Sequence, residues 1–263
     1  MKKVELEIYK ALYQSRLYDQ IDIEICCIFS LCRLKLHTGK WQEATELIEQ
    51  LRKTVEQRNN SVYNTTMDIC TAYLSCCIRH TENVPDWIKS NKQENGAFMY
   101  MNLGLHHVTS GYYALLKKEY VQLLVLCDEY ERDWTKFRCQ MGLLYCNIFR
   151  ACSSYGLHDL DNAVKYLRIA LDSAYRDGII LPFAEINSGV QELLKLPEIQ
   201  NRYPEEYLTR LDDCCGRHVN SISLINDTPK LLSERELQIL DLLCQDKTHQ
   251  EIGNELFISV ATV

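Results

Sequence analysis

The chain has 263 residues, a formal net charge of −7, and 46% hydrophobic and 25% charged residues. This composition suits one large or two small folded domains, and the acidic balance argues against a general nucleic-acid or anionic-membrane surface. Neither an apolar segment behind Met1-Lys2-Lys3 nor a run of about 18 apolar residues occurs, so we expect no signal peptide and no membrane span. A cytoplasmic protein is expected.

The 13 cysteines raise the question of a metal site or a disulfide framework. Several are adjacent pairs, such as Cys26-Cys27 and Cys76-Cys77, and no Cys-x-x-Cys spacing occurs. Most of the others fall on apolar faces of expected helices, where free cysteine behaves as a small hydrophobic side chain. We therefore expect reduced cysteines that pack in the core, with a redox or metal role as the alternative.

Long segments with apolar side chains at helical spacing predict an all-α fold, in agreement with only 10 glycines and 5 prolines. Gly39 is expected to end one helix in the left-handed conformation, and the segment 81–96 is expected to be broken. Residues 223–230 read as a linker. The expected helices are 3–18, 21–38, 41–58, 62–79, 97–116, 120–135, 138–155, 160–174, 183–194 and 205–218.

The helices form a repeating pattern. Trp41 with Ala44, Tyr120 with Leu123, and Leu160 with Ala163 each stand just after the turn that joins a long helix to the next. The period is about 40 residues, which is typical of stacked helical pairs. Residues 1–222 are therefore expected to form a right-handed helical-pair solenoid, similar to tetratricopeptide repeats, that acts as a sensor or interaction domain.

Polar side chains follow the first helix of each pair at intervals of three or four residues, and in a solenoid these helices line the concave surface. The stripes predict a groove for a small-molecule effector or a protein partner, and the alternative is a merely solvated face. Arg150 has no acidic residue three or four positions away, so it is the first candidate to bind an anion. The candidate groove residues are Asn102, His106, Tyr113, Asn147 and Arg150.

The sequence contains no strong signal for catalysis, a metal or a cofactor. His106-His107 lacks carboxylate or thiol partners at ligand spacing, so we expect no metal site. A nucleophile elbow, a paired-carboxylate motif and a phosphate-binding loop are all missing from the sequence. We expect a protein that is not an enzyme and needs no cofactor.

The last stretch, residues 231–263, has the layout of a helix-turn-helix. Ser233 can cap a first helix, and Glu236 stands three positions later, as in a capping box. Thr248 can cap a second helix with Ile252 on its apolar face, and Ser259 can cap a third. In such a motif the later helix enters the major groove of DNA.

This stretch resembles the DNA-binding domain of LuxR-type regulators, with departures at Ser233, Asp246 and Gly253, where the family has Thr, Gly and Ala. Together with the repeats it is similar to the large ATP-dependent regulators of the maltose-activator (MalT-like) type, although no Gly-x-x-x-x-Gly-Lys-Ser/Thr motif occurs. The positions that correspond to the family's motif are Leu232, Ser233, Arg235, Glu236, Glu251, Ile252, Gly253, Leu256, Phe257, Ile258, Ser259, Thr262 and Val263.

The resemblance implies a bacterial transcription regulator whose helical repeats control DNA binding through Thr248, Ser259, Ala261 and Thr262. It also implies that the regulator can form a homodimer. The recognition helix is expected to continue beyond Val263, and residues 231–263 carry two basic against six acidic side chains. DNA binding is therefore expected of the full-length protein and not of these 263 residues. The alternative is a helical-repeat interaction scaffold without DNA-binding activity.

Overall fold

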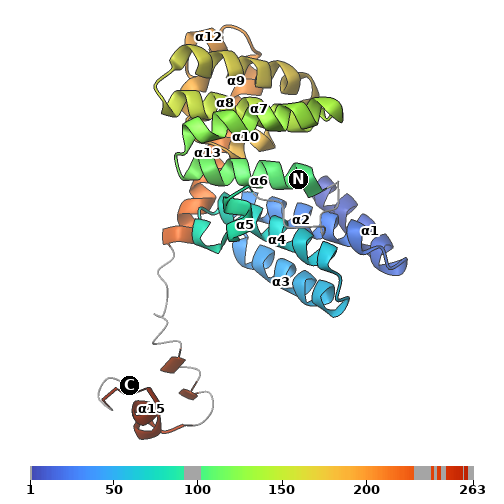
Figure 1. Ribbon diagram of the computed structural model, residues 1–263, viewed down its shortest axis with the longest axis vertical. Helices are drawn as coiled ribbons and strands as arrows, with labels where there is room; N and C mark the ends of the chain where they lie inside the picture. Colours follow the sequence, from blue (N-terminus) through green and yellow to red (C-terminus); the bar gives the residue numbers. More distant parts are fainter. Residues whose placement is uncertain are drawn as a thin grey trace. The chain divides into compact units, whose positions relative to one another are not determined.

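The computed structural model describes residues 2–91, 102–227, 238–239, 242–243, 247–256 and 258–259 (Figure 1). Every regular element in these ranges is a helix, which confirms the predicted all-α class. None of the described helices is long and apolar enough to cross a membrane. The chain divides into two compact units, Met1–Ser223 and Leu224–Val263, and we describe each by itself.

The first unit is a series of helices joined by short turns, and consecutive long helices pack against each other (Figure 1). Sequence periodicity located most of these long helices to within two residues. The elements are α1 (Lys2–Leu17), α2 (Ile21–His37), α3 (Trp41–Gln57), α4 (Ser61–Cys77), η1 (Thr81–Asn83), α5 (Asp86–Lys89), α6 (Asn102–Leu116), α7 (Tyr120–Lys136), α8 (Gln140–Gly156), α9 (Leu160–Ala174), η2 (Tyr175–Asp177), α10 (Leu181–Glu185), α11 (Val190–Leu194), α12 (Pro197–Gln200) and α13 (Glu205–Asp227).

The long helices end in turns of the same kind. After most of them a residue takes a positive φ, and the next amide donates to a carbonyl five positions earlier in several turns. Lys40 donates to Lys35 and Cys139 to Trp134 in this way, at 2.9 Å each. Gly39 is among these residues, as predicted. The turns recur at about 20-residue intervals, at Asp19, Gly39, Asn59, Arg79, Lys118, Arg138, His158 and Gly178.

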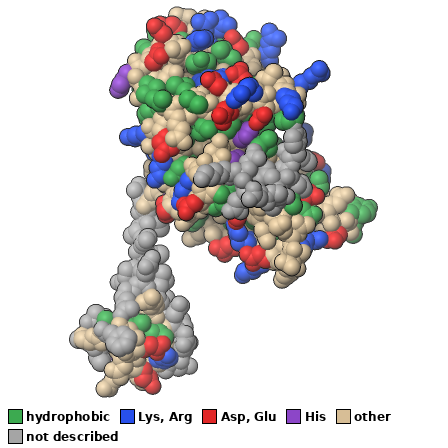
Figure 2. Space-filling view, viewed as in Figure 1, with side chains coloured by type: hydrophobic (Ala, Val, Ile, Leu, Met, Phe, Trp, Pro, Cys, Tyr) green, Lys and Arg blue, Asp and Glu red, His purple; other side chains and the backbone are tan. Residues whose placement is uncertain are grey.

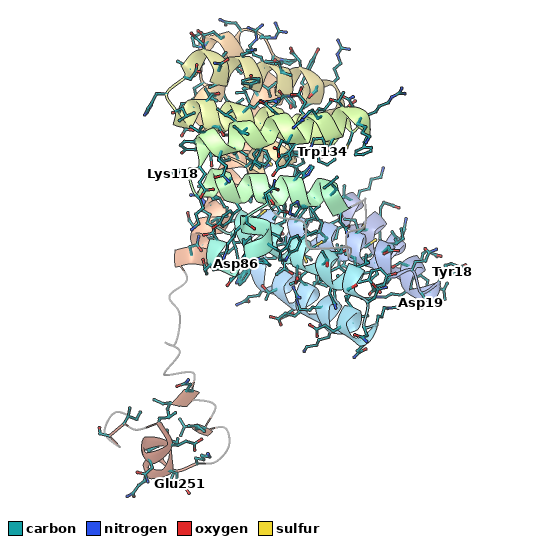
Figure 3. The ribbon with its side chains drawn as sticks, viewed as in Figure 1. Tyr18, Asp19, Asp86, Lys118, Trp134 and Glu251 are labelled. Carbon is teal, nitrogen blue, oxygen red and sulfur yellow. The ribbon has the colours of Figure 1, made fainter. Side chains whose placement is uncertain are left out.

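Small residues on one helix admit large aromatic side chains from the next. Trp134 on α7 lies against Gly104 on α6 and Gly142 on α8, and a Cβ atom at either glycine would overlap the indole ring (Figure 3). Phe149 on α8 lies against Gly111 on α6 in the same way. These contacts let adjacent helices approach closely and fix how α6, α7 and α8 pack.

Two predicted helices differ from the structure. The expected helix 183–194 is two helices, because Gly189 takes φ +93° and the Asn187 side chain accepts a bond from the Gln191 amide, which starts α11 anew. The expected helix 205–218 continues to Asp227, so residues 223–227 of the expected linker are helical. Residues 228–230 lie outside the described ranges.

Candidate functional site

Side chains from the first helices of the pairs meet at one buried carboxylate, but none of them is a predicted groove residue. Glu185, at the end of α10, is 2% exposed. The Arg33 guanidinium on α2 donates to both of its carboxylate oxygens, at 2.8 and 2.6 Å, and the Tyr73 hydroxyl on α4 donates to Oε2 at 2.7 Å. The Tyr112 hydroxyl on α6 donates to the Glu185 carbonyl, and Arg33 also donates to the Tyr145 hydroxyl on α8 at 3.4 Å. We call these five residues the Glu185 cluster.

The Glu185 cluster holds an ionised pair inside the protein. Burial raises the pKa of Glu185, but the charge and hydrogen bonds of Arg33 and the Tyr73 hydroxyl outweigh burial, so the pKa lies below its ordinary value. The Arg33 guanidinium is also desolvated, and the Tyr73 and Glu185 groups raise its pKa well above the ordinary value. A buried pair with this number of hydrogen bonds orients α10 against α2, α4 and α6.

The structure does not bring the predicted groove residues together on an open surface. Asn102 donates to Thr66 Oγ1 at 2.5 Å, and Asn147 donates to the carbonyl of Leu143 on its own helix at 2.9 Å. His106 is buried and stacks on Trp87, with ring centroids 5.4 Å apart. Tyr113 is half-buried, with the Lys117 ammonium 5.7 Å from its ring centroid.

Arg150 has no acidic residue three or four positions away, but the structure gives it two acidic partners from elsewhere in the chain. Its guanidinium contacts Asp128 at 2.7 Å and Glu131 at 2.6 Å, and it lies 5.6 Å from the Tyr166 ring centroid. Arg150 itself is only 6% exposed. Both carboxylates come from α7, the neighbouring helix, and not from positions on the same helix. Arg150 therefore joins α7 to α8, and carboxylates of the same chain balance its charge.

The cysteines pack as predicted in the described ranges. Apart from Cys26 and Cys139 they are buried, and none forms a disulfide there. Burial raises the pKa of Cys152 to about 12, which keeps this thiol protonated and unreactive. No cluster of three or more His, Cys, Asp or Glu side chains that would hold a metal ion occurs among the described residues.

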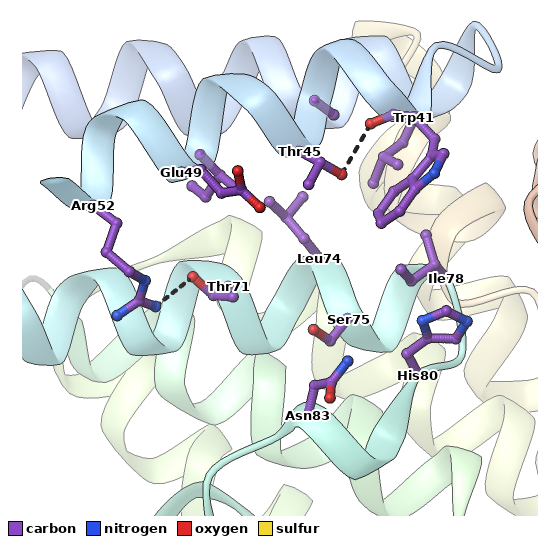
Figure 4. Close-up of a pocket in the computed structure, with 13 residues that line it drawn as sticks. Trp41, Thr45, Glu49, Arg52, Thr71, Leu74, Ser75, Ile78, His80 and Asn83 are labelled. Carbon is purple, nitrogen blue, oxygen red and sulfur yellow. Dashed lines mark hydrogen bonds between the residues drawn. The ribbon is translucent and has the colours of Figure 1, made fainter. Parts of the chain in front are cut away.

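Three hollows lie in or beside the region of the stripes. One, of about 400 Å³, lies between α3 and α4, where Arg52 donates to the Thr71 hydroxyl at 2.9 Å and pairs with Asp68 at 3.1 Å (Figure 4). The other two, of about 450 and 550 Å³, share Arg33 and Leu181 in their walls. On the outer surface, acidic and basic side chains are interspersed over the visible face, with no large area of one sign (Figure 2).

In the second unit, α15 (His249–Leu256) begins with a reciprocal capping box. The Thr248 hydroxyl accepts a bond from the Glu251 amide at 3.3 Å, and the Glu251 carboxylate accepts bonds from the Thr248 amide and hydroxyl at 2.8 and 2.7 Å. Ile252 is fully buried and Ser259 is exposed. The structure thus confirms Thr248 as the cap. Of the other predicted DNA-binding residues, Ala261 and Thr262 lie outside the described ranges.

The comparisons with known proteins agree with the motif in this unit. Residues 230–263 match the family model described as bacterial regulatory proteins, luxR family. The chain is also 36% identical over 81 residues to the transcriptional regulatory protein LiaR of Bacillus subtilis (strain 168). This alignment covers 30% of the chain and 35% of LiaR, so the chain spans about a third of that relative. No solved structure matches the chain. These similarities support a transcription regulator of the LuxR type.

Proposed function

We propose that the chain is a non-enzymatic bacterial transcription regulator in which the helical unit Met1–Ser223 receives a signal and controls a C-terminal LuxR-type DNA-binding segment. The match of residues 230–263 to the luxR family model carries this proposal. The capped helix α15 agrees with it, because Thr248 and Glu251 form the box where the second helix of the motif is expected to begin. A regulator of this class acts in the cytoplasm, and we propose that it binds DNA as a homodimer.

A tetratricopeptide-like, right-handed solenoid is the arrangement that we propose for the helical unit. Turns at about 20-residue intervals give helical pairs with a period of about 40 residues. Glycines at the contacts of α6 with α7 and α8 provide the small positions against which the large side chains of such repeats pack. The first helices α2, α4, α6 and α8 all contribute to the Glu185 cluster, which supports their sharing one face.

The position of α10 supports the proposal that the helical unit Met1–Ser223 receives a signal. Side chains from α2, α4 and α6 contact α10 through the Glu185 cluster. Arg33 lines two hollows in which a small effector has room. We propose that effector binding beside α10 shifts the unit between two states, one of which favours DNA binding.

DNA binding by the product of the complete reading frame tests the proposal. A random duplex library is selected on the purified protein, and selected sites are titrated by fluorescence anisotropy between about 50 and 200 mM salt. We expect site-specific binding that weakens steeply as the salt concentration rises. Ser259→Ala should weaken binding, whereas Ser173→Ala, a control within the helical unit on α9, should not.

The alternative is a helical-repeat scaffold that binds proteins and not DNA. If selection enriches no sequence and the protein binds random duplexes no better than an acidic protein of equal size, the scaffold is correct and the regulator proposal is wrong. Equal binding by the Ser259→Ala variant would remove that residue from the DNA interface.

A further inference from the structure

The larger hollow beside Arg33 has the chemistry of a ligand site. It measures about 550 Å³, which is within the range of pockets that hold small molecules. Side chains from α1, α2, the N-terminal end of α10 and α13 line it, and it is open on one side. Its lining residues are Val4, Ile8, Ser30, Arg33, Leu34, His37, Ile180, Leu181, Cys214 and Arg217.

The polar side of this cavity is positively charged and partly unpaired. Arg217 is exposed, and its guanidinium has no carboxylate partner among the described residues. His37 Nε2 is shielded from solvent and has no hydrogen-bond partner in the described ranges. Arg33 is already paired with Glu185, so that charge is balanced. No acidic residue belongs to the lining.

The opposite side of the cavity is apolar. Val4 and Ile8 from α1, Leu34 from α2, and Ile180 and Leu181 beside α10 form this wall. A fully hydrated anion such as inorganic phosphate would leave this wall in contact with water or desolvate itself against it, and both are unfavourable. A ligand with one small anionic end and an apolar body satisfies both sides.

We propose that this cavity binds a small monocarboxylic acid with an apolar body, such as a medium-chain fatty acid or an arylacetic acid. Its carboxylate accepts hydrogen bonds from the Arg217 guanidinium, which is exposed at the polar side of the cavity. The apolar body lies against Ile8, Leu34 and Leu181. Because Arg217 is on α13, which runs to Asp227, occupation of the cavity acts directly on the helix that leads to the C-terminal segment. That regulatory role rests on the proposed function, whereas the binding itself does not.

Calorimetric titration of the purified chain tests the site, with octanoate and phenylacetate as probes and their primary amides as neutral controls of the same shape. We expect at least one carboxylate to bind and its amide to bind at least tenfold more weakly. Arg217→Gln should weaken carboxylate binding at least tenfold. Arg210→Gln removes the same charge from an exposed position on the same helix, outside the cavity, and should leave the affinity unchanged.

A second variant tests the apolar wall of the cavity. Ile8→Phe narrows the cavity at that wall and should weaken octanoate binding without altering the polar groups. The proposal is overturned if neither carboxylate binds, if the amide binds equally well, if inorganic phosphate binds as tightly, or if Arg217→Gln and Arg210→Gln have the same affinity. The titration contains no DNA, so its failure leaves the DNA-binding result untouched, and failure to bind DNA leaves the titration interpretable.

Discussion

His218, on α13, is a buried imidazole without hydrogen-bond partners. It is 2% exposed, neither ring nitrogen has a partner in the described ranges, and its ring centroid lies 4.8 Å from that of His37. Burial, helped by the neighbouring His37 and opposed by Glu185, lowers its pKa to about 4. An ordinary histidine has a pKa of about 6.5, so His218 stays neutral in the folded protein at pH values where the unfolded chain already binds a proton.

This difference in pKa predicts that the unfolding free energy decreases as the pH is lowered. Because the folded pKa is the lower one, the contribution of His218 is fully present above the unfolded pKa and is lost as pH falls from about 6.5 towards 4. Removing the imidazole with His218→Phe should reduce the loss of unfolding free energy between pH 7 and pH 5 by an amount on the order of 2 kcal/mol. Urea unfolding followed by tryptophan fluorescence measures it. Parallel pH profiles for the two proteins would contradict the prediction.

Two residues show what sequence reasoning can and cannot find at this scale. The helix that carries Arg33 was predictable, because helical periodicity reports which residues share a face. The partner of Arg33, Glu185, is 152 positions away in a short apolar segment, and no local pattern indicates it. Arg150 was misread for the same reason, since its carboxylates lie on α7. Pairings between helices depend on packing that the sequence alone does not supply.

At the scale of the elements, the helix-ending turns place several non-glycine residues in the left-handed conformation. Asp19, Lys118 and Arg138 take φ values of 54°, 60° and 53° (Figure 3 labels the first two). For residues other than glycine this conformation costs about 1 kcal/mol, because Cβ approaches a carbonyl oxygen. The packing of the helices on both sides holds these turns in place despite that cost.

Arg138→Gly should therefore raise the unfolding free energy of the helical unit by about 0.5–1 kcal/mol, since Arg138 is exposed and glycine adopts this φ freely. Arg132→Gly is the matched control. It changes the same residue type at an exposed position inside α7, and it should lower the free energy by about 1 kcal/mol. Chemical unfolding of both variants gives the two signs, and a loss of stability in Arg138→Gly would show that the turn is not strained.

The same local physics explains why the long helices were predictable. Their bounds follow from apolar periodicity and from turn residues, both of which act over a few positions. The break at Gly189 was missed because the apolar pattern runs on through residues 183–194 and hides the new helix start at Asn187. The extension of α13 to Asp227 was missed because Asn226-Asp227 resembles the start of a turn.

At the scale of the whole molecule, the division into Met1–Ser223 and Leu224–Val263 separates two kinds of inference. The C-terminal motif was recognisable in sequence because the chemistry of caps and a helix-turn-helix is local, and the family match bears it out. The helical unit carries no such motif. Its candidate ligand site, beside Arg33 and Arg217, became visible only when α1, α2, α10 and α13 were placed together.

This division makes a prediction for a shortened chain. The Glu185 cluster, the cavity beside Arg217 and all three tryptophans, Trp41, Trp87 and Trp134, belong to Met1–Ser223. A chain that ends at Asp227 keeps α13 whole, so its tryptophan-detected unfolding free energy should match that of residues 1–263 to within about 0.5 kcal/mol. Its octanoate affinity should be unchanged as well. A chain that ends at Arg217 is the control, because it removes His218 and the last turns of α13 and should unfold at lower urea. If the chain that ends at Asp227 is destabilised as strongly as the one that ends at Arg217, the helical unit does not fold independently.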